Sequence, residues 1–293
     1  PKLANYRSPK DSAQDRCFLA IHLRGGRSSD SQKIAAVRRA GYPTAVLTLA
    51  RPELSRYMQF IHYVVFGIAW QQKMNFVTQP GVELYKAITN RLHAEAQKAG
   101  GIVQTREWRA MHDSSRRSRW RQGITLYYDR LPRDISTEGK DAASAYAAIL
   151  RSLSSDRRIE YGELTFFGDT RYSAAGRGVR KVLDRAGDRL FRAALRMPVD
   201  IHEGPAMNHS YHEMVIGHGR CLSTVLLSET AQELEAAEYA ADYHRAQFLA
   251  TQMALAERGR YVVALTVRDL GSPSLTALGE FFTEAAKSVK GKR

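Results

Sequence analysis

The chain has 293 residues, of which 44% are hydrophobic, so it can form one large or two ordinary domains with real cores. No apolar run reaches the length that a membrane span needs, and the polar first dozen residues contain no signal-peptide pattern. The net charge of +14 attracts anions such as phosphorylated metabolites, nucleic acid or acidic lipid, without choosing among them. The two cysteines, Cys17 and Cys221, match no redox motif, which favours a reducing, cytosolic setting. Because the chain starts at Pro1 rather than Met, we expect a fragment or a processed chain.

The N-terminal part of the chain predicts a parallel βαβ unit followed by two long helices. The apolar runs 17–23 and 44–49 are typical of buried strands, and helix start and stop signals lie between them. Pro52 opens a long helix that is apolar nearly all round, so we expect it to be buried. The segment 75–81 breaks that helix, and residues 82–101 form the next one, which glycines close.

The rest of the chain alternates between strands and helices after an irregular, Arg-rich stretch at 102–122. We expect strands at 123–129, 159–168, 221–229 and 260–269, and helices at 141–153, 178–195, 242–259 and 274–289. The pattern predicts an α/β protein of two blocks, with mainly parallel sheets flanked by helices. The predicted domains are 1–101 and 123–293, with 102–122 as the linker.

One short stretch points to a family. MNFVTQPGVELYK (74–86) follows the long apolar helix and resembles the Gln-Pro-Gly-Val-Glu…Lys signature of bacterial phosphoglucose isomerases. Three flanking pieces are similar, in the same order, to the bifunctional transaldolase/glucose-6-phosphate isomerase type: 15–26, 161–170 and 243–267. The resemblance covers nearly all of the chain and implies a sugar-isomerase-like fold.

The resemblance also implies a reaction and a set of site residues. Phosphoglucose isomerases interconvert glucose 6-phosphate and fructose 6-phosphate through an enediol, in glycolysis and gluconeogenesis, and need no cofactor. Lys86 corresponds to the family's lysine, which would stabilise the anionic intermediate or the ring oxygen, and Gln79 and Gly81 would contact the hexose phosphate. A second family motif, His-Ser-Thr-Gly-Gln, corresponds to the start of HSYHEMVIGHGRC, which makes His209 a catalytic candidate and Ser210 a substrate-binding one.

The chain also departs from the family. It lacks the Ser-Gly-Thr-Thr phosphate loop and the Glu-Ser-x-Gly-Lys motif that carries the base, and Val215 and Ile216 replace a basic pair. We therefore expect a C-terminal portion of a cytosolic isomerase that is inactive alone and needs a missing N-terminal isomerase half. From the residues alone, an ordinary helix start with a solvated Lys86 explains 75–86 as well.

Three further patterns leave alternatives open. His209, His212, His218 and Cys221 have a spacing that would suit a tetrahedral zinc site, but a polar loop before a buried strand explains them too, and we expect no metal. AAGRGVRK (174–181) lacks phosphate-loop spacing and favours a helix cap.

The third pattern is the stretch 106–133, which holds eight arginines against three acidic residues. Trp108 and Trp120 are interleaved with these arginines, an arrangement that could bind phosphates and stack on bases, or form a solvated linker. The alternative function is therefore a degenerate, non-catalytic isomerase-like domain that binds RNA or a ribonucleoprotein.

Overall fold

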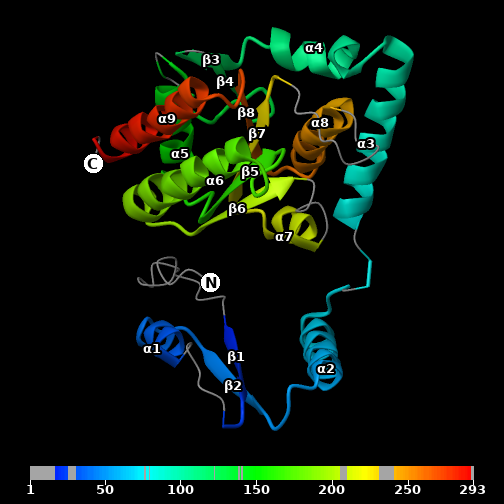
Figure 1. Cartoon of the computed structure of the whole chain (residues 1–293), viewed down its shortest axis with the longest axis vertical. Coiled ribbons are helices and arrows are strands. Elements are labelled where there is room, and N and C mark those ends of the chain that lie inside the picture. The colour runs from blue at the N-terminus through cyan, green and yellow to red at the C-terminus, as the bar shows by residue number, and fades with distance from the viewer. Residues whose placement is uncertain are drawn as a thin grey trace. The chain divides into compact units, whose positions relative to one another are not determined.

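The computed structural model describes residues 17–25, 31–75, 77–78, 80–121, 123–137, 139, 141–204, 210–230 and 241–291, with the backbone alone for 210–212, 218 and 241. The chain divides into two compact units, Pro1–Gln79 and Pro80–Arg293 (Figure 1). The boundary therefore lies directly before the helix that begins at Pro80, and not at residue 101 as the sequence led us to expect.

The first unit is a parallel βαβ unit followed by one long helix. Its elements are β1 (Phe18–Leu23), α1 (Ser31–Arg39), β2 (Thr44–Leu49) and α2 (Leu54–Gln72). A small cluster of Val37, Ala40 and Tyr42 packs against Phe18, and the rings of Phe18 and Tyr42 meet edge to face with centroids 5.6 Å apart. This cluster buries only a small part of the unit's apolar surface.

Most of the exposed large hydrophobic side chains belong to the first unit. Among the described residues seventeen are exposed, and fourteen of these lie between Leu19 and Val77. The expectation that β1, β2 and α2 are buried is wrong for the chain by itself: Ala20 is the one buried residue in the two strands, and Trp70 and Tyr63 of α2 are 77% and 68% exposed. An apolar helix needs a second layer to cover it, and two strands with a small core do not provide one. No helix in the described part of the chain is long and apolar enough to cross a membrane.

The second unit is built on a six-stranded sheet in the order β3-β4-β8-β7-β5-β6. Its strands are β3 (Arg117–Trp120), β4 (Ile124–Tyr127), β5 (Tyr161–Phe167), β6 (Val199–Gly204), β7 (Cys221–Ser228) and β8 (Tyr261–Val267). The four strands β8, β7, β5 and β6 are parallel, whereas β3 and β4 add an antiparallel edge. β5 and β7 are buried at every position, as expected for central strands of a parallel sheet that is covered on both faces.

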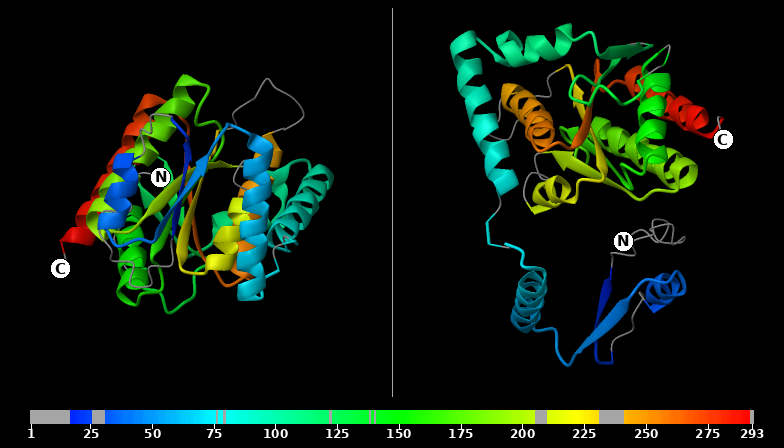
Figure 2. Two further views of the ribbon diagram at one scale, coloured as in Figure 1. Left: turned by 90° about the horizontal axis from the view of Figure 1, so that it is seen from below. Right: turned by 180° about the vertical axis from the view of Figure 1, so that it is seen from behind.

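Helices cover both faces of this sheet (Figure 2). One face, here called the α9 face, carries α5 (Ala142–Ser155), α6 (Ala174–Ala186), the π-helix η3 (Gly187–Leu195) and α9 (Ser272–Lys290). The other, the α3 face, carries α3 (Pro80–Ala99), the short helix η2 (Ile102–Gln104), α4 (Arg106–Asp113), α7 (Ser210–His218) and α8 (Ala241–Glu257). The predicted α/β class, with mainly parallel sheets flanked by helices, is confirmed.

The sequence reading missed the elements that are short or polar. β6 is an edge strand whose four central residues are only half-buried, so it carries no apolar run. The stretch 102–122 was expected to be an irregular linker, but η2, α4 and β3 fold into the second unit. Ile102, Trp108 and Trp120 bury their side chains there, and a few buried residues among many arginines give a weak local signal.

Candidate functional site

The start of α3 is held by a carboxylate from a distant part of the chain. Pro80 occupies the first turn, where its missing N–H costs nothing, and the next backbone N–H groups have no partner within the helix. Glu213 of α7 supplies one: its Oε2 accepts hydrogen bonds from Gly81 N at 2.8 Å and Val82 N at 3.0 Å. A carboxylate at this position also lies favourably at the positive end of the helix dipole.

Gly81 makes this close approach possible. A Cβ atom added to Gly81 would lie 2.9 Å from Glu213 Oε2 and 2.9 Å from Ile216 Cδ1, closer than side chains tolerate. Tyr85 and Ile88 of α3 then pack in the same buried cluster as Val215 and Ile216 of α7. The two stretches that the sequence singled out, 75–86 and 208–221, are therefore in contact.

The structure fully describes two of the five predicted site residues, Lys86 and Gly81. The Lys86 side chain is 49% exposed and pairs with Glu83 Oε1 at 3.1 Å on the surface of α3. Gln79 and His209 lie outside the described residues, and of Ser210 only the backbone, at the start of α7, is described. Gly81 is buried, with its N–H taken by Glu213. The roles assigned to these five residues therefore stay predictions.

The central sheet carries a buried carboxyl group that the sequence reading did not single out. Glu163 of β5 is 0% exposed and accepts hydrogen bonds from Thr165 and from Ser223 Oγ, the latter at 2.6 Å. Burial raises the pKa of the Glu163 carboxyl, although these two hydrogen bonds act in the opposite direction. An acidic residue inside the apolar run YGELTFF was the available signal.

Two residues near Glu163, Cys221 and Tyr161, are also buried. Cys221, at the start of β7, is 3% exposed, and burial, together with the nearby Glu163, raises the pKa of its thiol well above the ordinary value. Tyr161 donates a hydrogen bond to Asp200 of β6. Because Glu163 and Cys221 are enclosed and the hydrogen-bond partners of Glu163 are internal, neither side chain is offered to a ligand.

Three of the four side chains that could form the zinc site lie outside the part of the chain that the structure describes. These three are His209, His212 and His218. Cys221 begins a buried strand, in agreement with the alternative prediction of a polar loop that leads into such a strand. The side chains that are described contain no group of three His, Cys, Asp or Glu residues that could hold a metal ion.

The carboxyl ends of the parallel strands are where α/β proteins usually bind ligands, and here the loop after β5 is occupied by internal contacts. Asp169, just after β5, accepts hydrogen bonds from the backbone N–H groups of Arg171, Tyr172 and Ser173 at 2.7–2.8 Å. Burial opposes ionisation of Asp169, but a hydrogen bond from the Ser173 side chain and these three backbone bonds outweigh it and lower the pKa of Asp169 to about 2. Ser173 in turn caps α6, so the glycine-rich stretch 174–181 is the first turns of a helix and not a phosphate loop.

The Arg-rich stretch 106–133 is also partly used inside the fold. Trp108 and Trp120 are each 8% exposed, so neither ring is available to stack on a base. Arg116 donates hydrogen bonds to backbone carbonyls at Asp129, Leu131 and Pro132. The positions of both tryptophans and of some of the arginines are therefore explained by contacts within the fold, without any partner molecule.

Comparison with known proteins adds little. No family model matches the chain, and no curated protein matches its sequence. Among solved structures, the hypothetical protein TT0462 from Thermus thermophilus aligns with 98% of this chain and 80% of its own, at 11% identity and a TM-score of 0.37. That TM-score is too low to support any argument about function.

Proposed function

We propose that this chain is the C-terminal portion of a cytosolic phosphoglucose isomerase-like protein, which interconverts an aldose and a ketose hexose phosphate through an enediol. The observation that carries the proposal is the hydrogen bonding between Gly81, Val82 and Glu213, because it joins the two stretches that resemble family motifs. Such contact is what a shared site requires, and the sequence resemblance does not by itself imply it.

In this proposal the chain is inactive alone. The first unit leaves α2 and both strands with exposed apolar side chains, such as Leu19, Val46 and Phe66, and an additional layer would cover them. A missing N-terminal isomerase half would supply that layer, together with the phosphate loop and the base. Lys86, on an exposed surface of α3, would face the substrate only once that half is present.

The test is an isomerase assay of the chain combined with the polypeptide encoded directly upstream of it. We expect turnover of fructose 6-phosphate by the combination and none by either part. Lys86→Ala should lower kcat by about a hundredfold, the usual effect of removing one group that stabilises a developing negative charge. Lys98→Ala, which removes an exposed lysine from the last turn of the same helix, is the matched control. Equal activity of the two variants would contradict the assignment of Lys86, and no turnover by the combination would contradict the function.

A further inference from the structure

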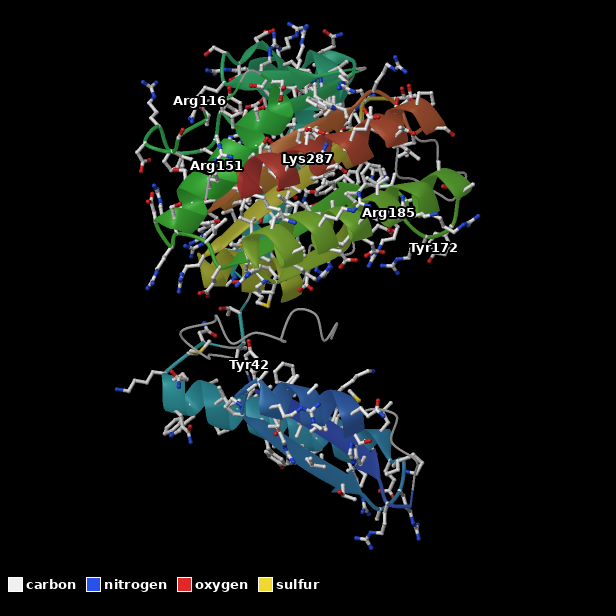
Figure 3. All side chains as sticks on the ribbon, turned by 90° about the vertical axis from the view of Figure 1, so that its left-hand side faces the viewer. Tyr42, Arg116, Arg151, Tyr172, Arg185 and Lys287 are labelled. Atoms are coloured by element: carbon white, nitrogen blue, oxygen red, sulfur yellow. The ribbon has the colours of Figure 1, made fainter. Side chains whose placement is uncertain are left out.

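A groove lies on the α9 face of the second unit, on the opposite side of the sheet from Glu213 and Lys86. It runs between α6 and α9 and has a volume of about 670 Å³, within the usual range for pockets that bind small molecules. Its floor is apolar, with Val182 and Ala186 from α6 and Leu275 and Phe282 from α9. Figure 3 shows Arg185 on α6 and Lys287 on α9, which both line it.

Some charged side chains of the groove have an ion-pair partner, and two arginines have none among the described residues. Glu280 pairs with Arg121 at 3.1 Å, and Glu284 pairs with Lys287 at 2.5 Å. Arg185 and Arg189 are exposed and have no hydrogen bond or ion pair with any residue that the structure describes. Two guanidinium groups are thus left over on one wall after the carboxylates of the other wall have been neutralised.

The positions of these two arginines suit one anionic group. The two arginines are about one helical turn apart and both line the groove, so both side chains can reach a single phosphate. The planar guanidinium donates paired hydrogen bonds that match phosphate or carboxylate oxygens. Between them, at Gly187, the α-helix changes to the π-helix η3. Segments of π-helix are rare in proteins overall, and those that occur are often found at functional sites.

The groove is open at Gly279, one of its lining residues. A Cβ atom added there would meet nothing within 4 Å, whereas one on Gly178, which also lines the groove, would lie 2.8 Å from Leu275 Cδ1. The space above Gly279 is therefore unfilled by the protein, next to the apolar floor and within the same groove as the arginines.

We propose that this groove binds a small molecule that carries a phosphate group and a ring. The phosphate lies between Arg185 and Arg189, and the ring rests on the floor formed by Val182, Leu275 and Phe282. This site is separate from the proposed isomerase site and does not depend on it.

A single-stranded nucleic acid fits the groove less well. The tryptophan that lines it, Trp120, is buried, and the guanidinium of Arg121 lies 5.0 Å from its ring centroid, so its aromatic face is not open for base stacking. Arg121 and Lys287, the other basic residues paired in the groove, are already bound to Glu280 and Glu284, so they do not extend the two arginines into a track for a continuous phosphate backbone.

The test titrates adenosine monophosphate, and inorganic phosphate as a second probe, into the full chain by calorimetry. We expect saturable one-to-one binding of adenosine monophosphate that is tighter than that of phosphate. Arg185→Glu combined with Arg189→Glu should weaken it by about tenfold or more, and Gly279→Leu, which fills the floor without changing charge, by a similar factor.

Each variant has a matched control. Arg106→Glu with Arg109→Glu on α4 makes the same charge change away from the groove, and Gly67→Leu on α2 fills another helical glycine whose Cβ would meet nothing. Replacing a helical glycine with leucine favours the helix, and circular dichroism checks that each variant folds.

Four outcomes would overturn the proposal. The first is no saturable binding of either probe at millimolar concentration. The second is binding that Gly279→Leu leaves unchanged, and the third is binding that the α4 charge control weakens equally; either result would place the phosphate on the general basic surface. The fourth is displacement of the nucleotide by single-stranded RNA whose affinity rises with its length, which would assign the groove to a polyanion.

Discussion

Gly81 and Glu213 are 132 residues apart in the sequence, and a hydrogen bond of 2.8 Å joins Gly81 N to Glu213 Oε2. The absence of a Cβ on Gly81 lets the carboxylate approach, and the free N–H groups of the helix start give it two donors. The glycine of the Gln-Pro-Gly stretch thus has a structural reason in this chain that is independent of any substrate.

Removing the Glu213 carboxylate should destabilise the second unit. Glu213→Ala leaves Gly81 N and Val82 N without an acceptor, and we expect the free energy of unfolding to fall by about 1–2 kcal/mol, as for other helix caps. Glu213→Gln keeps an acceptor oxygen and should lose less. Urea denaturation measures both. The control is Glu83→Ala, which breaks an exposed ion pair with Lys86 and should change little. A loss in the control equal to that in Glu213→Ala would contradict this account.

Glu163 should make the protein less stable as the pH rises. Because burial raises its pKa in the folded state, the folded protein binds the proton more tightly, and this contribution is complete below the ordinary pKa of 4.5. It is lost as the pH rises from 4.5 through the folded-state pKa. Glu163→Gln removes the titrating group, so its stability relative to the parent chain should increase over that pH range and then level off. Glu257→Gln, at an exposed position at the end of α8, makes the same substitution away from the sheet and is the matched control. If the difference in the free energy of unfolding between Glu163→Gln and the parent chain were the same at all pH values, Glu163 would not be the titrating group.

Asp169 should act in the opposite direction. Its folded-state pKa of about 2 lies below the ordinary value of 3.8, so its contribution to stability is present above pH 3.8 and is lost as the pH falls through about 2. Asp169→Asn weakens the bonds from three backbone N–H groups and should cost about 1 kcal/mol or more at neutral pH. The gap between the two proteins in thermal or urea unfolding should narrow in acid. A gap that widens in acid would contradict this sign.

The tryptophans of the Arg-rich stretch should matter for stability and not for RNA binding. Trp108→Ala and Trp120→Ala empty buried sites and should each lower the free energy of unfolding by about 3–5 kcal/mol. Trp70→Ala, at a side chain that is 77% exposed, is the control and should cost little. Iodide should accordingly quench the fluorescence of Trp70 and leave the other two largely unaffected. A stable Trp120→Ala protein with lost RNA affinity would favour the alternative function.

The second unit should fold without the first. Its buried clusters lie between its own helices and sheet, and the chain divides directly before Pro80. A protein of residues 80–293 should unfold in one cooperative transition and bind less of an apolar dye than the full chain, because most exposed apolar side chains lie before it. Equal dye binding by both proteins, or a non-cooperative transition in the shorter one, would show that the units depend on each other.

The sequence predicted the core of the second unit well because its signal is local. The runs 161–167 and 221–228 are buried at every position in a parallel sheet, so apolar residues dominate them. Such an apolar run is enough to predict the strand. The sequence did not predict β6, because this edge strand, with half-buried Asp200 and His202, contains no apolar run. The same limit explains 102–122, where Trp108 and Trp120 are buried by contacts with segments far away in the chain.

The run 44–49 shows the opposite failure. It gave the same local signal and did form β2, but no residue of this strand is buried. An apolar run indicates a strand, whereas its burial depends on a second layer that the run itself cannot specify.

The sequence by itself determined the α/β class, the order of most helices and strands, and the two stretches at 75–86 and 208–221 as the ones of interest. Only the tertiary structure decided that these stretches meet, that Glu213 takes the N–H groups of the α3 start, and that Lys86 lies on an exposed surface. It alone revealed the groove with Arg185 and Arg189. The physical reason is that periodicity and propensity report the local preference of each segment, while contacts between distant side chains arise only when helices and sheet pack against one another.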